Sequence, residues 1–190
     1  KEFEKLSRNI RTVQVYKKVL ADLLTHVSAW VYLSQTSKYG FLLESVEKGN
    51  QYSRYSYVGI NPKKIFAHEN GESVIYEHGT RKVIDQSFID LIREEQSHYK
   101  TEKIPGIPSF TGGLVGYLGY ESVSWFENIT VHKHSEINVP DSVFMLFEDM
   151  IAFDHLKGTA LVIANINIDK ETDLKEQFDS AHRRIDALGE

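Results

Sequence analysis

The chain has 190 residues, of which 41% are apolar and 26% are charged, and its net charge is −5. This length and composition suit one domain with a substantial hydrophobic core. The charges are interspersed, which argues against a nucleic-acid-binding or anionic-membrane surface. The chain has no cysteine, which excludes a disulfide framework and a thiolate metal site and is compatible with a reducing cytoplasm.

The sequence shows no targeting or membrane segment. No apolar run approaches the roughly 20 residues that span a bilayer, and the first residues, Lys1-Glu2-Phe3-Glu4-Lys5, lack the apolar core of a signal peptide. We therefore expect a cytoplasmic protein. Because the chain starts without methionine and stops at Glu190, just after a predicted helix, we also expect it to be a piece of a longer protein.

Two helices are predicted near the start of the chain. Apolar residues recur at roughly helical spacing over residues 15–24 and predict the first. The second is expected over His26–Leu33, with Val27, Trp30 and Val31 as its packing residues.

Strands dominate the rest of the chain. Asn70-Gly71 lies between two alternating segments and is the strongest short signal for a hairpin. The expected strands are residues 41–47, 53–60, 65–68, 73–78, 82–84, 113–118, 143–147, 151–153 and 159–166.

Helices are inserted between and after these strands. Ser87, with Asp90 three positions later, resembles a capping box and predicts a helix that ends near Tyr99. A helical turn is expected over residues 121–127, and a closing helix from Asp169. The apolar stripe of the closing helix comprises Leu174, Phe178, Ala181, Ile185 and Leu188. The pattern predicts an α+β domain on a largely antiparallel sheet, with no linker.

Several conspicuous motifs carry no assignable chemistry. The glycines at 112, 113, 116 and 119 do not fit a dinucleotide fingerprint, and we interpret them as small residues that allow Tyr117 and Tyr120 to pack or a backbone to cross closely. His132-Lys133-His134 is interpreted as a solvated loop rather than a metal pair. Asp141 and Asp154 are interpreted as turn formers. We assign no catalytic and no metal-binding residue.

One polar pair stands inside a segment predicted to be a buried strand. Glu44 and Ser45 follow Leu42 and Leu43 there, and an interior carboxylate costs several kcal/mol unless it is paired or hydrogen-bonded. Arg54, at the start of the next predicted strand, is the candidate partner. Two interpretations remain open: a structural polar pair under a hairpin, or a site that holds a small polar ligand at the sheet face.

Three motifs occur here in an order typical of one enzyme family. They are Leu42-Leu43-Glu44-Ser45-Val46-Glu47, then Arg54-Tyr55-Ser56 with Gly59, then Gly112-Gly113-Leu114-Val115-Gly116-Tyr117. From about Val13 to Asn165 the chain resembles the N-terminal region of anthranilate synthase component I, among the chorismate-using enzymes. The chain departs from the family at Thr25-His26-Val27-Ser28, where Thr-Pro-Val-Ser is frequent.

The resemblance implies an architecture and partners. The chain would be half of a larger two-part α/β sandwich, residues 1–190 being its N-terminal domain. The chorismate-binding catalytic half, with its Mg²⁺, would lie beyond residue 190. A glutamine amidotransferase subunit (component II) would be the protein partner, and the parent would form anthranilate and pyruvate from chorismate.

The resemblance also implies an effector site. In the family the serine of Leu-Leu-Glu-Ser contacts L-tryptophan, the feedback inhibitor, and this role is carried to Ser45. Strand alternation places Leu43 on the ligand side and Glu44 on the other face. Glu44 and Arg54 either brace the strand or reach the amino-acid head group. The alternatives are the same region of aminodeoxychorismate synthase component I, a stand-alone amino-acid-binding module, and a purely structural half.

Overall fold

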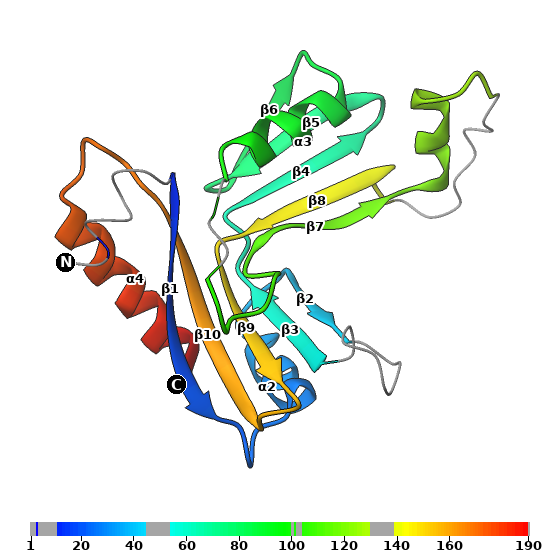
Figure 1. Cartoon of the computed structure of the whole chain (residues 1–190). Coiled ribbons are helices and arrows are strands. Elements are labelled where there is room, and N and C mark those ends of the chain that lie inside the picture. The colour runs from blue at the N-terminus through cyan, green and yellow to red at the C-terminus, as the bar shows by residue number, and fades with distance from the viewer. Residues whose placement is uncertain are drawn as a thin grey trace. The chain divides into compact units, whose positions relative to one another are not determined.

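The chain forms two compact units, where its length had suggested one domain. The computed structural model describes residues 3, 11–44, 54–99, 101, 104–129 and 139–189. The first unit comprises residues 1–62, 98–113 and 147–190, and the second comprises residues 63–97 and 114–146 (Figure 1). Each unit has its own five-stranded sheet, and every strand pair whose register is defined is antiparallel. The predicted α+β class is confirmed.

The sheet of the first unit joins segments from both ends of the chain. Its strand order is β1-β10-β9-β3-β2, so that β1 lies at one edge and pairs with β10 along its full length. The strands are β1 (Thr12–Leu20), β2 (Gly40–Leu43), β3 (Tyr55–Ile60), β9 (Asp149–Asp154) and β10 (Thr159–Asn167).

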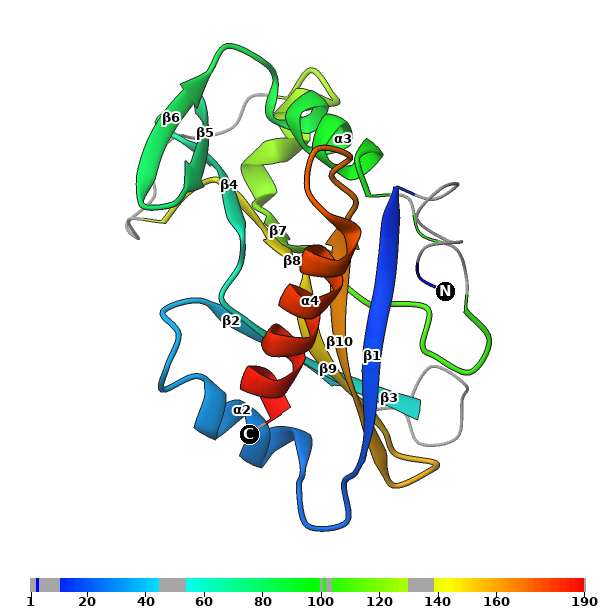
Figure 2. The same ribbon diagram turned by 90° about the vertical axis from the view of Figure 1, so that its left-hand side faces the viewer.

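Helices α2 (His26–Leu33) and α4 (Leu174–Gly189) contribute to one hydrophobic core with this sheet. Figure 2 shows α4 running alongside β1 and β10. Ala181 and Ile185, two members of the stripe predicted for the closing helix, are buried there. The helix begins at Leu174 rather than at Asp169. None of the described helices is long and apolar enough to cross a membrane.

The N-terminal segment differs from its prediction. Residues 15–24, expected to be helical, belong largely to β1. The β-branched residues Val13, Val15 and Val19 occupy alternate positions of this strand and favour extended backbone. Pairing with β10 then outweighs a helical spacing that was only approximate.

Helix α2 forms where it was predicted, although only one of its three predicted packing residues, Trp30, packs against the core. Thr25 caps it, because its hydroxyl accepts a hydrogen bond from the Ser28 N–H at 3.0 Å. The buried residues are Ala29 and Leu33, while Val27 and Val31 are exposed. The helix is apolar on most sides, so the sequence alone could not distinguish its inner face.

The second unit carries the sheet β6-β5-β4-β8-β7. Asn70 and Gly71, with φ of 53° and 79°, form the predicted hairpin turn. The predicted strands are confirmed. They are β4 (Lys64–Glu69), β5 (Glu72–Glu77), β6 (Thr80–Ile84), β7 (Gly113–Leu118) and β8 (Ser142–Phe147).

Helix α3 (Phe88–Ser97) packs on this sheet, and a 3₁₀ helix, η2 (Tyr120–Trp125), follows β7. The Ser87 hydroxyl accepts a hydrogen bond from the Asp90 N–H at 3.2 Å, which confirms the predicted cap. At Gly116, any Cβ would overlap the Val143 carbonyl oxygen. The close-crossing interpretation of the glycine segment therefore holds, whereas Tyr117 and Tyr120 are exposed rather than packed.

Candidate functional site

An ion pair joins two neighbouring strands of the first unit. Arg54, directly before β3, donates from Nε and Nη2 to the two carboxylate oxygens of Asp154 at 2.9 and 2.6 Å. The Asp154 side chain is 4% exposed and that of Arg54 is 30% exposed. The hydrogen bonds from Arg54 hold the pKa of Asp154 below its usual range, although burial acts in the opposite direction. This two-pronged contact fixes the ends of β3 and β9 together.

Asp154 is also a turn former, as the sequence predicted. Its Oδ1 accepts hydrogen bonds from the backbone N–H groups of Leu156 and Lys157, at 3.2 and 3.3 Å. Asp154 therefore both closes the β9–β10 turn and anchors Arg54. The second role was not predicted from the sequence, because its partner lies 100 positions away.

Glu44 does not pair with Arg54, contrary to the sequence-based prediction. Its carboxylate contacts Nε2 of His26, the first residue of α2. The expectation of an interior carboxylate is also wrong, since the Glu44 side chain is 46% exposed. The physical reason is that β2 ends at Leu43, so solvent reaches the residue that follows. The Glu44–His26 contact ties the end of β2 to the start of α2.

A serine and a histidine lie beside this contact. The Ser56 hydroxyl, buried in β3, shares a hydrogen bond of 2.7 Å with Nε2 of His155. The His155 ring meets the His26 ring edge-on, with centroids 5.1 Å apart. Burial, and then the proximity of His26, lower the pKa of His155. The neutral imidazole is therefore favoured, and it links Ser56 to the His26–Glu44 contact.

Leu43 lies on the other face of the sheet. Leu42 packs against the core that includes the helices, so alternation directs Leu43 away from them. Leu43 pairs with Tyr57 in β3 and is 42% exposed. On the same face the Tyr57 ring is 5.3 Å from the Phe110 ring in an edge-on arrangement. Burial, and then Tyr55, raise the pKa of Tyr57 to about 12, so its hydroxyl stays protonated beside Leu43.

The geometry thus brings together some of the predicted residues and separates others. Leu43 and Glu44 lie at the end of β2, and Arg54 is held at the start of β3 by Asp154. Ser45 lies outside the described residues, as does His132-Lys133-His134. The sequence analysis missed His26, Ser56 and His155. For His26 a signal existed, because it stands where the family frequently has proline.

Apolar and hydrogen-bonding groups lie close together in sequence at the end of β2, on opposite faces of the sheet. This arrangement offers a half-exposed apolar residue beside aromatic rings on one face, and hydrogen-bonding groups on the other. Ser56 and His155 resemble a nucleophile and base, yet no carboxylate among the described residues accepts from His155 Nδ1, and Ser56 is buried. No group of three or more His, Asp or Glu side chains in the described part of the chain is placed to hold a metal ion.

Comparison with known proteins identifies the family. A family model described as chorismate binding enzyme matches residues 39–187. The chain belongs to the chorismate binding enzyme family. The family predicted from the three sequence motifs is thereby confirmed.

Several relatives of this chain are named anthranilate synthase component 1. Anthranilate synthase component 1 of Arthrobacter globiformis is 33% identical, and the match covers 98% of this chain and 36% of that protein. The protein of the same name from Acinetobacter calcoaceticus is 34% identical over 98% of this chain and 38% of its own length. The crystal structure of anthranilate synthase component I from Streptococcus pneumoniae TIGR4 has a TM-score of 0.56 and 27% identity, covering 92% of this chain and 37% of that one. The chain thus spans little more than a third of these relatives.

Proposed function

We propose that this chain is the N-terminal regulatory and structural part of an anthranilate synthase component I. The similarity to anthranilate synthase component 1 across 98% of the chain carries this proposal. The parent enzyme would convert chorismate and ammonia, or glutamine through a glutaminase subunit, to anthranilate and pyruvate. Because the chain spans little more than a third of such relatives, chorismate and Mg²⁺ would bind to the rest of the parent.

The proposed role of the chain is to contribute to an L-tryptophan feedback site at the end of β2. Leu43, half exposed beside Tyr57 and Phe110, would supply apolar surface for an indole ring, and Ser45 would supply a hydroxyl. Arg54 is engaged with Asp154, which supports a bracing role rather than direct contact with the effector. Glu44 is tied to α2 but remains exposed enough to reach an amino group.

Feedback inhibition at such a site would be a coupling free energy between two states of the parent. Couplings of this kind are typically about 1–3 kcal/mol. Tryptophan would favour the inactive arrangement only by binding it more tightly than the active one. The ion pair between Arg54 and Asp154 supports this role, because it holds β3, the partner of β2, in a fixed position.

The first test concerns catalysis by the chain alone. The purified 190-residue chain is expected to form no anthranilate from chorismate and ammonium in the presence of Mg²⁺, measured by anthranilate fluorescence. The full-length parent, assayed in parallel, is the control and should form anthranilate. Anthranilate production by the chain alone would falsify the proposal that catalysis belongs to the rest of the parent. Production of aminodeoxychorismate by the parent would favour the alternative, aminodeoxychorismate synthase component I.

The second test concerns regulation. In the parent, Ser45→Phe is expected to abolish inhibition by L-tryptophan while kcat and KM for chorismate change less than about twofold, because the bulky ring fills the proposed effector site. Ser97→Phe, at the exposed end of α3, is the matched control and should keep inhibition. Equal loss of activity and inhibition in Ser45→Phe contradicts a regulatory role. If calorimetry detects no tryptophan binding to the wild-type parent, the alternative of a purely structural role for this chain is favoured.

A further inference from the structure

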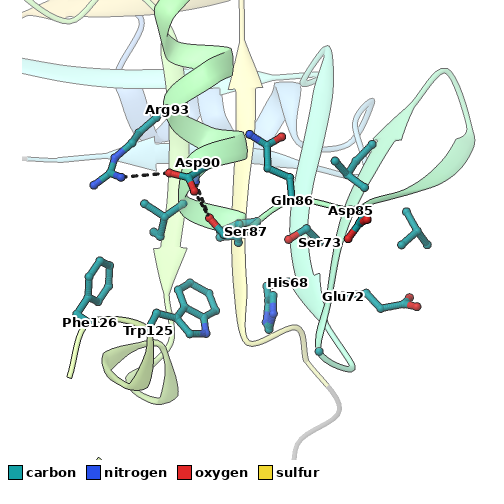
Figure 3. A pocket seen from close by; sticks show the side chains of 15 residues that line it. His68, Glu72, Ser73, Asp85, Gln86, Ser87, Asp90, Arg93, Trp125 and Phe126 are labelled. Atoms are coloured by element: carbon teal, nitrogen blue, oxygen red, sulfur yellow. Dashed lines mark hydrogen bonds and ion pairs between the residues drawn. The ribbon is translucent and has the colours of Figure 1, made fainter. Parts of the chain in front are cut away.

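The second unit contains a hollow that has no role in the proposed function. It has a volume of about 740 Å³ and lies between β5, β6, the start of α3 and η2 (Figure 3). Pockets of about 300–1,000 Å³ are typical of small-molecule sites. All its lining residues belong to the second unit, whereas Leu43, Glu44, Ser45 and Arg54 belong to the first. The hollow is therefore a separate candidate site.

Aromatic rings form one wall of this hollow. The Trp125 ring is 4.7 Å from the His68 ring and 5.8 Å from the Phe88 ring. His68 is held in place because its Nδ1 hydrogen-bonds Asp141 at 3.1 Å. Phe126, next to Trp125, is exposed and also lines the hollow. Such a wall attracts apolar groups, and the indole face in particular attracts a cation.

The hydroxyl of a largely buried serine points into the same space. Ser73 in β5 is 6% exposed, and its hydroxyl makes no hydrogen bond with any residue that the structure describes. Figure 3 shows the Ser73 oxygen directed toward the side where Ser87 and His68 lie. The Ser73 oxygen does not belong to the fully buried polar atoms that lack a partner, so it faces the open space of the hollow and is available to a polar group of a ligand.

An unpaired carboxylate also lines the hollow. Ser73 pairs with Ile84 in β6, and Asp85 follows Ile84 in the chain. Asp85 has no ion-pair or hydrogen-bond partner within the described ranges. The other two acids of the lining are engaged, since Glu72 accepts from Arg81 at 3.1 Å and Asp90 from Arg93 at 3.3 Å. Asp85 is thus the acid available to a ligand.

We propose that this hollow binds a small organic cation with an apolar or aromatic body. The body would lie against Trp125 and Phe126, and its ammonium group would donate to the Asp85 carboxylate and the Ser73 hydroxyl. The carboxylates of Glu72, Asp85 and Asp90 outnumber the two arginines that engage them, Arg81 and Arg93, so an anionic ligand is disfavoured. The site does not depend on the anthranilate synthase proposal, and each can fail without the other.

The test uses three probes of similar shape and different charge: phenethylamine, phenethyl alcohol and hydrocinnamate. The intact native protein is labelled with 5-fluorotryptophan and observed by ¹⁹F NMR, with the Trp125 resonance assigned by its loss in Trp125→Phe. Phenethylamine is expected to shift the Trp125 resonance saturably and to leave the Trp30 resonance, from the first unit, in place. The alcohol should bind at least about tenfold more weakly, and hydrocinnamate should not bind.

Variants then test the contacts. Asp85→Asn is expected to weaken phenethylamine binding about fivefold or more, and Ser73→Ala to weaken it measurably. Asp179→Asn removes the same charge from an exposed position on α4 in the first unit and should bind like the wild type. The proposal is overturned if phenethylamine leaves the Trp125 resonance unmoved, if the three probes bind equally, or if Asp179→Asn weakens binding as much as Asp85→Asn.

Discussion

At the scale of single residues, the site depends on polar side chains that lie far apart in sequence. Arg54 and Asp154 pair across 100 positions, and Ser56 and His155 across 99. Each pair joins β3 to the end of β9 or the turn after it. The sequence indicated Arg54 as one member of an ion pair, because the carboxylate of Glu44 was expected to be interior and to require a partner, but Arg54 pairs with Asp154 instead. The sequence could not identify Asp154, because the pairing of β3 with β9 is set by the whole sheet.

His155 predicts how stability depends on pH. Its pKa is lowered in the native state by burial, whereas in the unfolded chain a histidine has its ordinary value of about 6.5. The unfolded state therefore binds more protons below about pH 7, and the free energy of unfolding falls as the pH drops through that value. Asp154, whose native pKa is also lowered, contributes stability that is lost only below about pH 4, so the two effects are separable.

We expect His155→Gln to show a smaller loss of unfolding free energy between pH 7.5 and pH 5.5 than the wild type, measured by urea denaturation at both values. His78→Asn is the control. His78 is exposed, and its φ of 51° suits asparagine, so this variant should keep the wild-type dependence. If His155→Gln retains the full dependence, the His155 imidazole is not its source.

At the scale of elements, local sequence signals predicted most strands and helices and failed at the N-terminus. Asn70-Gly71 and the Ser87 cap are complete within a few residues, so both were predictable. The segment that forms β1 contains no such local signal, and its pairing with β10 decides its conformation. The inner face of α2 was likewise unpredictable, because exposed Val27 and buried Ala29 are both apolar.

Helix α4 provides a direct test of this packing. Ile185 is 2% exposed within the core shared by α4 and the sheet. Ile185→Ala is expected to lower the free energy of unfolding by about 2–5 kcal/mol, the range for truncating a buried isoleucine. Glu176→Ala, on the exposed side of the same helix, should change it by less than about 0.5 kcal/mol. Urea denaturation followed by circular dichroism measures both, and equal effects would contradict the assignment of the buried face.

At the scale of the whole molecule, the sequence predicted the fold class and family but not the division into two units. The second unit consists of residues 63–97 and 114–146, both inserted within the first. Asn61-Pro62 and Gly112-Gly113 stand at two of these boundaries, but such residues also occur at ordinary turns and did not indicate a division. The division arises from strand pairing, since β4, β5, β6, β7 and β8 form one sheet while β3 pairs with β9 in the other. Pairing between strands that lie far apart in the chain cannot be predicted from local sequence signals.

The location of β1 at the sheet edge has a consequence for synthesis in the cell. Among the described strands β1 pairs only with β10, which leaves the ribosome much later. At translation rates of about 5–20 residues per second, the nascent β1 waits on the order of ten seconds for its partner. The hairpins of β4, β5 and β6 are contiguous in the chain and can form during that interval. The valines of β1 remain without their partner strand during that interval and are available to chaperones.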